Sequence, residues 1–529
     1  MKLPRPSVKF TLLFALLLNF LLWQLLIPIW HFPDEQAHFA QVQNLAEFGT
    51  DSPQGRYSSD LSQEIFLSEQ LLGTTRNEFG KNKFTHHPDY RIDYTNSIIG
   101  EYENLINHQP FLSRQQFIKS EATHYPPLFY FLTAGFYRLN YNQGLINRVM
   151  SARLASILMG IIMVYFSFKL AELIFTDTFF SLTAAILVSF QPMFAFLTAG
   201  VNSDNLMNPL FTAFFYLCAL VIKKQRLTLR LVILLIITLL ALKLTKPHSF
   251  IALPIILSLL FFFPTKLFNL IKNNLRLTVA GLLIILIMIQ LRPITFSLPE
   301  LNPLALTRPN FPQYTLIEHV LWTTSHTVRE VIPWYWGVFN WLGVTLPRNV
   351  NRVLNRLLIL AVLGLGIWFV KIIRHRQFSS PQKLVLFLGS GSLIYFIVLG
   401  FWDWLFRRWN GFSFGMQGRY YFPVLAPHLI LFLIGLISLI PDKFPRLKLW
   451  WTKLIGLGMI GLNFIGWHTL AKSYYQLIPL PTFIFQISQY KPIIFKFPWL
   501  LIWFTLYLGV LGWFIFNYLA YANRSRSRI

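Results

Sequence analysis

Residues 10–38 read FTLLFALLLNFLLWQLLIPIWHFPDEQAH, and this stretch decides the fold class. The apolar run over residues 10–30 is long enough to cross a bilayer, because a helical span needs about 20 predominantly apolar residues. Pro33-Asp34-Glu35-Gln36-Ala37-His38 follows directly, so two carboxylates and an imidazole lie at the mouth of the first predicted span. Ionisable groups are costly beside lipid, and a cluster of them there indicates a functional site.

The composition of the whole chain is that of a polytopic all-α membrane protein. Of its 529 residues 54% are hydrophobic and only 13% are charged, whereas soluble proteins carry roughly 25% charged residues. The 46 Lys and Arg against 21 Asp and Glu give a net charge of +25. These basic residues fall in short clusters between apolar runs, which is the pattern of membrane topology, so we expect no nucleic acid partner. Cys218 is the single cysteine, which excludes an intrachain disulfide.

Apolar runs predict about 12 membrane spans within a single transmembrane domain over residues 1–529. The predicted spans cover residues 10–30, 150–174, 178–199, 204–222, 229–246, 248–264, 276–292, 354–373, 383–402, 421–440, 453–470 and 499–521. Basic clusters after alternate spans place the N- and C-termini in the cytoplasm, which requires an even number of spans.

Three loops are then predicted to face outward. Residues 31–124 form the first extracytoplasmic loop, residues 293–352 form a second large one, and residues 403–420 form a third. Pro33 suits a helix start, and we predict a short helix over residues 34–48 resting on the membrane. The apolar stretch 125–141, opened by Pro126-Pro127, is too short before Arg138 to span, so it is interpreted as a second juxtamembrane helix.

Acidic residues gather at the predicted outer face. Asp34 and Glu35 lie in the first helical turn, where negative charge is favoured, and His38 shares a face with Asp34. A simple acidic helix cap would need one acid and no histidine. Asp204 lies in an outward turn, Asn202-Ser203-Asp204-Asn205. An Asn- and Asp-rich turn is ordinary in itself, so Asp204 is either a site residue or turn chemistry.

Basic and aromatic residues lie at the same predicted face. Lys246 departs from the positive-inside pattern, and is either a snorkelling lysine or a phosphate ligand. Arginine binds phosphate in a bidentate manner, so Arg407, Arg408 and Arg419 on one short loop favour anion binding. Further candidates for substrate binding are His124, in a Pro-Pro turn; Gln417 and Tyr420, beside Arg419; and Trp336, in an interfacial aromatic belt or a sugar-stacking surface.

Carboxylates next to basic groups at a lipid surface suit a lipid phosphate donor and a hydroxyl-bearing acceptor. A carboxylate would take the acceptor's proton as general base, and the basic groups would bind the phosphate. Two or three acids at one face suit a divalent cation equally well, so a metal and its ligands stay open.

The chain resembles the GT-C class of integral-membrane glycosyltransferases, which use polyprenyl-phosphate-linked sugars, and is closest to an uncharacterised bacterial membrane family of that class. The resemblance is carried by Pro-Asp-Glu-x-x-His (33–38), Pro-Pro-Leu (126–128), Trp-Gly-x-Phe-x-Trp-Leu (336–342) and Gln-Gly-Arg-Tyr-x-x-Pro (417–423). Protein O-mannosyltransferases and lipid A aminoarabinose transferases are similar. The resemblance implies two juxtamembrane helices in the first outer loop, and a location in the bacterial inner (plasma) membrane with an extracytoplasmic active site.

These observations together predict an inverting glycosyltransferase of cell-envelope polysaccharide or glycoconjugate synthesis. It would move a sugar from a polyprenyl phosphate to a glycan, lipid or protein acceptor, with Asp34 as the base and Glu35 and Asp204 assisting. The alternative is a flippase or transporter of lipid-linked saccharides, which needs polar groups along a path through the whole membrane. Here the polar groups cluster at one face, which favours the enzyme.

Overall fold

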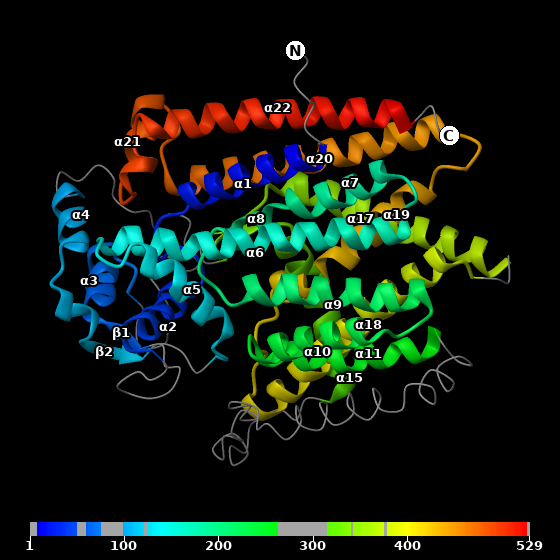
Figure 1. Cartoon of the computed structure of the whole chain (residues 1–529), viewed down its shortest axis with the longest axis horizontal. Coiled ribbons are helices and arrows are strands. Elements are labelled where there is room, and N and C mark those ends of the chain that lie inside the picture. The colour runs from blue at the N-terminus through cyan, green and yellow to red at the C-terminus, as the bar shows by residue number, and fades with distance from the viewer. Residues whose placement is uncertain are drawn as a thin grey trace.

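The computed structural model describes residues 8–49, 60–75, 99–120, 125–262, 315–339, 342–374 and 378–525. Long helices run side by side along the longest axis of the molecule, and the elements of the first predicted loop gather at one end of them, at the left in Figure 1. Helices dominate because the backbone of an apolar segment in lipid must satisfy its own hydrogen bonds.

Eight helices among the described residues are long and apolar enough to cross a membrane. They are α1 (Val8–Leu26), α6 (Leu145–Ile174), α9 (Asp204–Lys224), α17 (Arg348–Arg374), α18 (Ser380–Asn410), η5 with α19 (Gly418–Val424 and Leu425–Ser438), α20 (Pro445–Tyr474) and α22 (Trp499–Ser525). Each lies over one of the predicted spans. The all-α polytopic fold class is therefore confirmed.

The predicted span 178–199 is a bent pair of helices, α7 (Thr178–Ser189) and α8 (Pro192–Thr198), with 63° between them. Pro192 starts α8, and the residue before a proline is disfavoured in helical conformation, so the helix breaks there. Gln191 caps the second half by accepting a hydrogen bond from Phe194 N–H. This pair would bring the number of spans to nine.

Three predicted spans account for the difference from twelve. The span 229–246 is the shorter helix α10 (Leu229–Lys243), and 248–264 is a short run of η2 (Pro247–Ile251), α11 (Ala252–Leu257) and η3 (Ser258–Phe262). Both fall below the length of a full span. The predicted span 276–292 lies outside the described residues.

The first predicted loop folds into a unit of its own. Its described elements are α2 (Glu35–Phe48), β1 (Asp60–Ser62), α3 (Gln63–Leu71), α4 (Ile99–Asn107), η1 (Phe111–Arg114) and β2 (Phe117–Ser120), and α5 (Leu128–Leu139) follows. β1 and β2 pair antiparallel, with Asp60 opposite Ser120. A buried ion pair ties the unit to α6, since both Nη atoms of Arg148 lie 2.7 Å from the Glu64 carboxylate. The unit therefore has a fixed attachment to the long helices.

Between η3 and α17 the described elements are short. They are α15 (Leu316–His326), the π-helical turn η4 (Thr327–Val331), α16 (Ile332–Trp336), β3 (Val338–Phe339) and β4 (Val344–Thr345). Residues 293–314 of the predicted second loop lie outside the described residues. Two further elements, α21 (Leu480–Ile487) and η6 (Ile493–Phe495), precede α22.

Small residues let α17 and α19 touch backbone to backbone. A Cβ on Gly435 would lie 2.1 Å from the carbonyl oxygen of Ala361. A Cβ on Gly364 would lie 1.9 Å from the carbonyl oxygen of Gly435. Glycine at such crossings is how membrane helices pack closely without a hydrophobic driving force. This contact fixes the C-terminal part of α19 against α17.

Candidate functional site

Buried cations hold the turn between α1 and α2. The guanidinium of Arg153 on α6 donates to the carbonyls of Ile27 and Pro28, each at 2.9 Å, and Lys491 donates to the Ile27 carbonyl at 3.0 Å. The last carbonyls of a helix lack intrahelical partners, and basic side chains are their natural donors. The chain therefore leaves α1 in one defined direction, which places the acidic motif.

Glu35 is the carboxylate that pairs with Arg153 in this buried contact. It is fully buried, and its carboxylate pairs with Arg153, with Nε at 2.7 Å and Nη2 at 2.5 Å. The backbone N–H groups of Trp30 and Val201 also donate to it, each at 3.1 Å. The carboxylate is thus saturated and closed to solvent, so the predicted catalytic role of Glu35 does not fit the geometry. It joins the α1–α2 turn to the loop before α9.

Asp34 faces the site instead. It is the N-cap residue of α2, with φ 61° and ψ 14°, so the helix begins one residue later than predicted. Asp is one of the few residues that adopts this left-handed conformation readily. Its side chain is 41% exposed, and Oδ2 lies 3.6 Å from Nη2 of the buried Arg419 on η5. Two motifs far apart in the sequence therefore meet.

Asp204 and Lys246 form a second ion pair in the same place. Nζ of Lys246 donates to Oδ1 of Asp204, and both side chains are 10% exposed. Asn202 Oδ1 accepts the Asp204 backbone N–H at 2.9 Å, so the predicted turn chemistry is present as well. The other oxygen, Asp204 Oδ2, is buried without a hydrogen-bond partner among the described residues.

A small cavity of about 20 Å³ joins these groups, lined by Asp204, Lys246, Arg419, Tyr420 and Tyr395 among others. Nε and Nη1 of Arg419 are buried without hydrogen-bond partners in the described part of the chain. A cavity that holds one water needs about 10–15 Å³ and two or more polar partners. Unpaired donors and an unpaired acceptor at this cavity indicate a place for a small polar group.

The backbone before and after Arg419 is fixed by two buried side chains of α18. Asp403, near the end of α18, is fully buried and accepts hydrogen bonds from the Ser413 hydroxyl and the Phe414 N–H. Tyr395 Oη donates to the Tyr420 carbonyl at 3.0 Å. Asp403 and Tyr395 were not predicted as site residues, although an acid at the end of an apolar run is a signal for a site.

Steric crowding explains why the Gln-Gly-Arg-Tyr motif has a glycine at position 418. A Cβ on Gly418 would lie 2.2 Å from the backbone nitrogen of Tyr335, so η5 presses against α16. Gln417 is the N-cap residue of η5, and its carbonyl accepts the Tyr420 N–H at 3.1 Å. Two motifs of the resemblance are thus neighbours in space.

His38 lies behind Asp34 in an aromatic pocket. Its Nδ1 shares a 2.7 Å hydrogen bond with Tyr130 Oη, and its ring lies 5.5 Å from that of Tyr125. Lys246 Nζ lies 5.7 Å from the centre of the Tyr125 ring. Burial lowers the pKa of His38 from 6.5 to about 4; Asp34 opposes this shift and Lys246 adds to it. The imidazole is therefore neutral at neutral pH.

We expect His38→Gln to be less stable than the wild type at pH 7.5, and the deficit to shrink at pH 5. Unfolded His binds a proton below about pH 6.5, whereas folded His38 does so only near pH 4. As the pH falls from about 6.5 to about 4, titration of His38 lowers the stability of the wild type, and the variant has no such contribution. Thermal unfolding of both proteins at the two pH values measures this, and a constant deficit would contradict a neutral, buried His38.

Gly200 lies where the segment before Asp204 packs against the segment before Asp34. A Cβ at this position would lie 2.2 Å from the ring of Phe32, which is fully buried. We expect Gly200→Ala to lower stability by about 1–3 kcal/mol through overpacking, because the added Cβ forces Phe32 to shift. Gly135→Ala is the matched control, since no atom lies within 4 Å of its added Cβ. Equal unfolding temperatures of the two variants would refute the role of Gly200.

The other predicted residues lie elsewhere. The guanidinium of Arg407 lies 4.6 Å from the centre of the Trp322 ring, and that of Arg408 lies 5.2 Å from the ring of Trp404. Trp336 is only 3% exposed and packs against Phe432 in an apolar wall, which does not fit sugar stacking in solvent. His124 lies outside the described residues.

A metal site does not emerge from the described residues. Within the described ranges no group of three or more His, Cys, Asp or Glu is placed to hold a metal ion. Asp34 and Asp204 each face a cationic side chain instead. These four side chains suit an anion that bridges the two cations better than a cation between the two acids.

The fold and the site together define an all-α membrane protein in which Asp34, Asp204, Lys246 and Arg419 form a charged site. The chain belongs to the family of predicted membrane proteins called DUF2142, whose model matches residues 17–431. No curated protein matches the chain.

Several solved structures are similar to this chain at low identity, among them the following two. One is ArnT from Cupriavidus metallidurans bound to undecaprenyl phosphate, with 15% identity, a TM-score of 0.35 and coverage of 81% of this chain and 76% of ArnT. The other is the archaeal oligosaccharyltransferase AglB from Archaeoglobus fulgidus in complex with an inhibitory peptide and a dolichol phosphate. It has 14% identity and a TM-score of 0.39, and the match covers 84% of this chain and 56% of AglB.

Proposed function

We propose that this chain is a GT-C-type inverting glycosyltransferase. It transfers a sugar from a polyprenyl-phosphate donor to a glycan, lipid or protein acceptor in the synthesis of cell-envelope polysaccharides or glycoconjugates. The observation that carries this proposal is the meeting of the half-exposed Asp34 with Arg419, 3.6 Å away, beside the buried Asp204–Lys246 pair. A carboxylate open to solvent next to two cations provides a general base and a phosphate-binding site together.

In this reaction the Asp34 carboxylate takes the proton of an acceptor hydroxyl. The acceptor oxygen forms a bond to the anomeric carbon, and the bond from that carbon to the phosphate oxygen breaks with inversion. Arg419 and Lys246 stabilise the charge that develops on the leaving lipid phosphate. Asp204 positions Lys246 for this role, because its carboxylate accepts a hydrogen bond from that ammonium.

The orientation follows from the basic clusters. With both termini in the cytoplasm, Asp34 and Arg419 lie on the extracytoplasmic side of the plasma membrane. An acceptor would then be an extracytoplasmic glycan, lipid or protein. This orientation is part of the proposal, and cysteine labelling from outside at positions near Asp34 and Arg419 tests it.

The transfer assay separates this enzyme from a transporter. Purified protein in liposomes receives radiolabelled polyprenyl-phosphate sugars and a cell-envelope fraction. We expect label in the acceptor together with an equal amount of free polyprenyl phosphate. Movement of intact labelled lipid across the bilayer without release of free polyprenyl phosphate would support a flippase and contradict the proposed transfer.

A further inference from the structure

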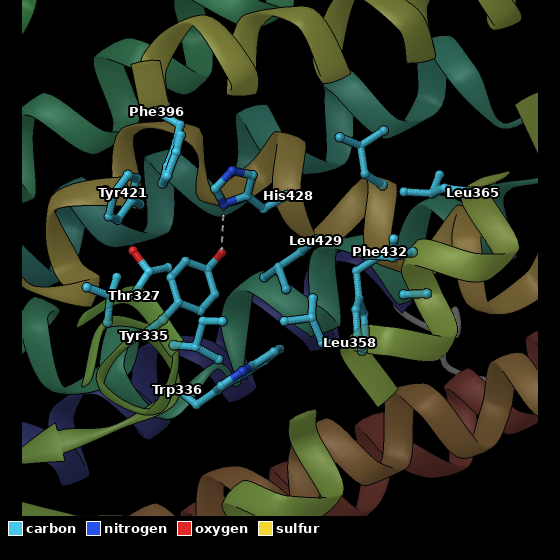
Figure 2. A pocket seen from close by; sticks show the side chains of 15 residues that line it. Thr327, Tyr335, Trp336, Leu358, Leu365, Phe396, Tyr421, His428, Leu429 and Phe432 are labelled. Carbon is cyan, nitrogen blue, oxygen red and sulfur yellow. Dashed lines mark hydrogen bonds between the residues drawn. The ribbon is translucent and has the colours of Figure 1, made fainter. Parts of the chain in front are cut away.

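An apolar cavity of about 270 Å³ lies beside the charged site, between α16, α17, α18 and α19. Figure 2 shows its lining, in which Tyr335 and His428 are turned toward each other. Tyr335 Oη and His428 Nδ1 are 3.3 Å apart and share a hydrogen bond. Because these two polar groups satisfy each other, the cavity presents almost only carbon to an occupant.

The cavity opens onto the surface of the helices. Val362 of α17 and Phe396 of α18 line it and are 61% and 39% exposed, respectively. Both helices are long and apolar enough to be membrane spans. An occupant can therefore enter sideways from the bilayer, as the chain of a lipid does.

The cavity and the charged site share two walls. On η5, Arg419 and Tyr420 line the charged site while Tyr421 lines the apolar cavity. On α18, Tyr395 lines the former and Phe396 the latter. The Phe396 and Tyr421 rings stack with 5.8 Å between their centres, so the two walls touch each other. A ligand with an anionic head and a long apolar chain matches the polarity of these two neighbouring spaces.

Further apolar space continues beyond Trp336 and Phe432. These two side chains line the cavity and also a second apolar cavity of about 520 Å³ between α17, α19 and α20. Trp336 is therefore placed to contact a lipid chain rather than a sugar.

We propose that the apolar cavity beside η5 holds the prenyl chain of the donor while the charged site holds its phosphate. This inference rests on the proposed function, since it names the place of the donor's lipid part. Trp336, Phe396 and Tyr421 are then the residues that contact the chain. The opening at Val362 is the entrance for the lipid.

Val362→Trp tests this entrance, with Val370→Trp as its matched control. Both valines are exposed positions of α17, at 61% and 50%, so neither substitution disturbs the interior. The probes are undecaprenyl phosphate and the five-carbon dimethylallyl phosphate, and their Kd values for the purified full chain are measured by native mass spectrometry. Unfolding temperatures confirm that both variants are folded.

We expect Val362→Trp to raise the Kd of undecaprenyl phosphate about tenfold, which corresponds to roughly 55 Å² of apolar surface that loses its burial. The Kd of dimethylallyl phosphate stays unchanged, because the phosphate site is intact. Val370→Trp changes neither value. A photoreactive group in the prenyl chain is expected to label α17 near Val362 and α19 near Phe432.

Three results overturn the inference in distinguishable ways. Equal effects of the two tryptophan variants, or labelling of other helices only, reject the cavity while the proposed transfer stands. Displacement of undecaprenyl phosphate by equimolar phosphatidylglycerol shows that the cavity binds ordinary acyl lipids and is not a site for the prenyl chain. Failure of the wild type to bind either prenyl phosphate rejects the proposed function together with this inference.

Discussion

Asp34→Asn is expected to lower kcat for sugar transfer about 10³-fold, because a general base contributes typically 10²–10⁴-fold to the rate. Asparagine has nearly the same shape and also adopts the left-handed conformation of residue 34, but it cannot accept a proton at neutral pH. Since Asp34 would act on the acceptor, the KM for the lipid donor should change little. Release of free polyprenyl phosphate from a radiolabelled donor measures both values.

Asp442→Asn is the control for this variant. Asp442 is also an acid in an ion pair, with Lys371 and Lys448, and its side chain is 79% exposed. We expect the control to retain wild-type transfer. An Asp34→Asn protein with the same kcat as this control would remove Asp34 from the role of base and would leave the charged site without a reacting group.

Arg419→Gln is expected to reduce kcat/KM for the donor about 10²–10³-fold, the usual loss when one group that stabilises developing charge is removed. The guanidinium is 5% exposed at the site and faces Asp34. Its loss removes a phosphate ligand and also the positive charge beside the base. Arg419→Lys should restore only part of the rate, because lysine lacks the planar fork that binds a phosphate through two hydrogen bonds.

Arg352→Gln is the control that tests whether the loss of an arginine outside the charged site has the same effect. Arg352 is exposed on α17 and contacts Asn349. Donor kinetics of the three variants, each with its unfolding temperature, separate a local effect from a loss of fold. If Arg419→Gln and Arg352→Gln proved equally active, Arg419 would be a structural partner of Asp34 only.

The fold class was predictable because membrane spans are a property of local composition. Eight predicted spans coincide with long helices. The break at Pro192 and the short helix α10 were less predictable, since a hydropathy pattern counts apolar residues and does not resolve where a helix bends or stops.

The site was predictable in part. Topology placed Asp34, Asp204, Lys246 and Arg419 at one membrane face, and the structure brings all four side chains to one charged site. The neighbouring acids Asp34 and Glu35 look alike in the sequence, yet one faces the site and the other is buried against Arg153. Arg153 itself, a buried arginine in an apolar helix, was the available signal for such a partner.

The sequence by itself determined that this chain is a helical membrane protein with acids and arginines at one face, because length, hydropathy and charge placement act locally along the chain. Only the tertiary structure decided which of these groups meet. The left-handed turn at Asp34, the close contact at Gly418 and the capped end of α1 set the relative positions of segments hundreds of residues apart. Such positions depend on packing between helices, which no single stretch of sequence encodes.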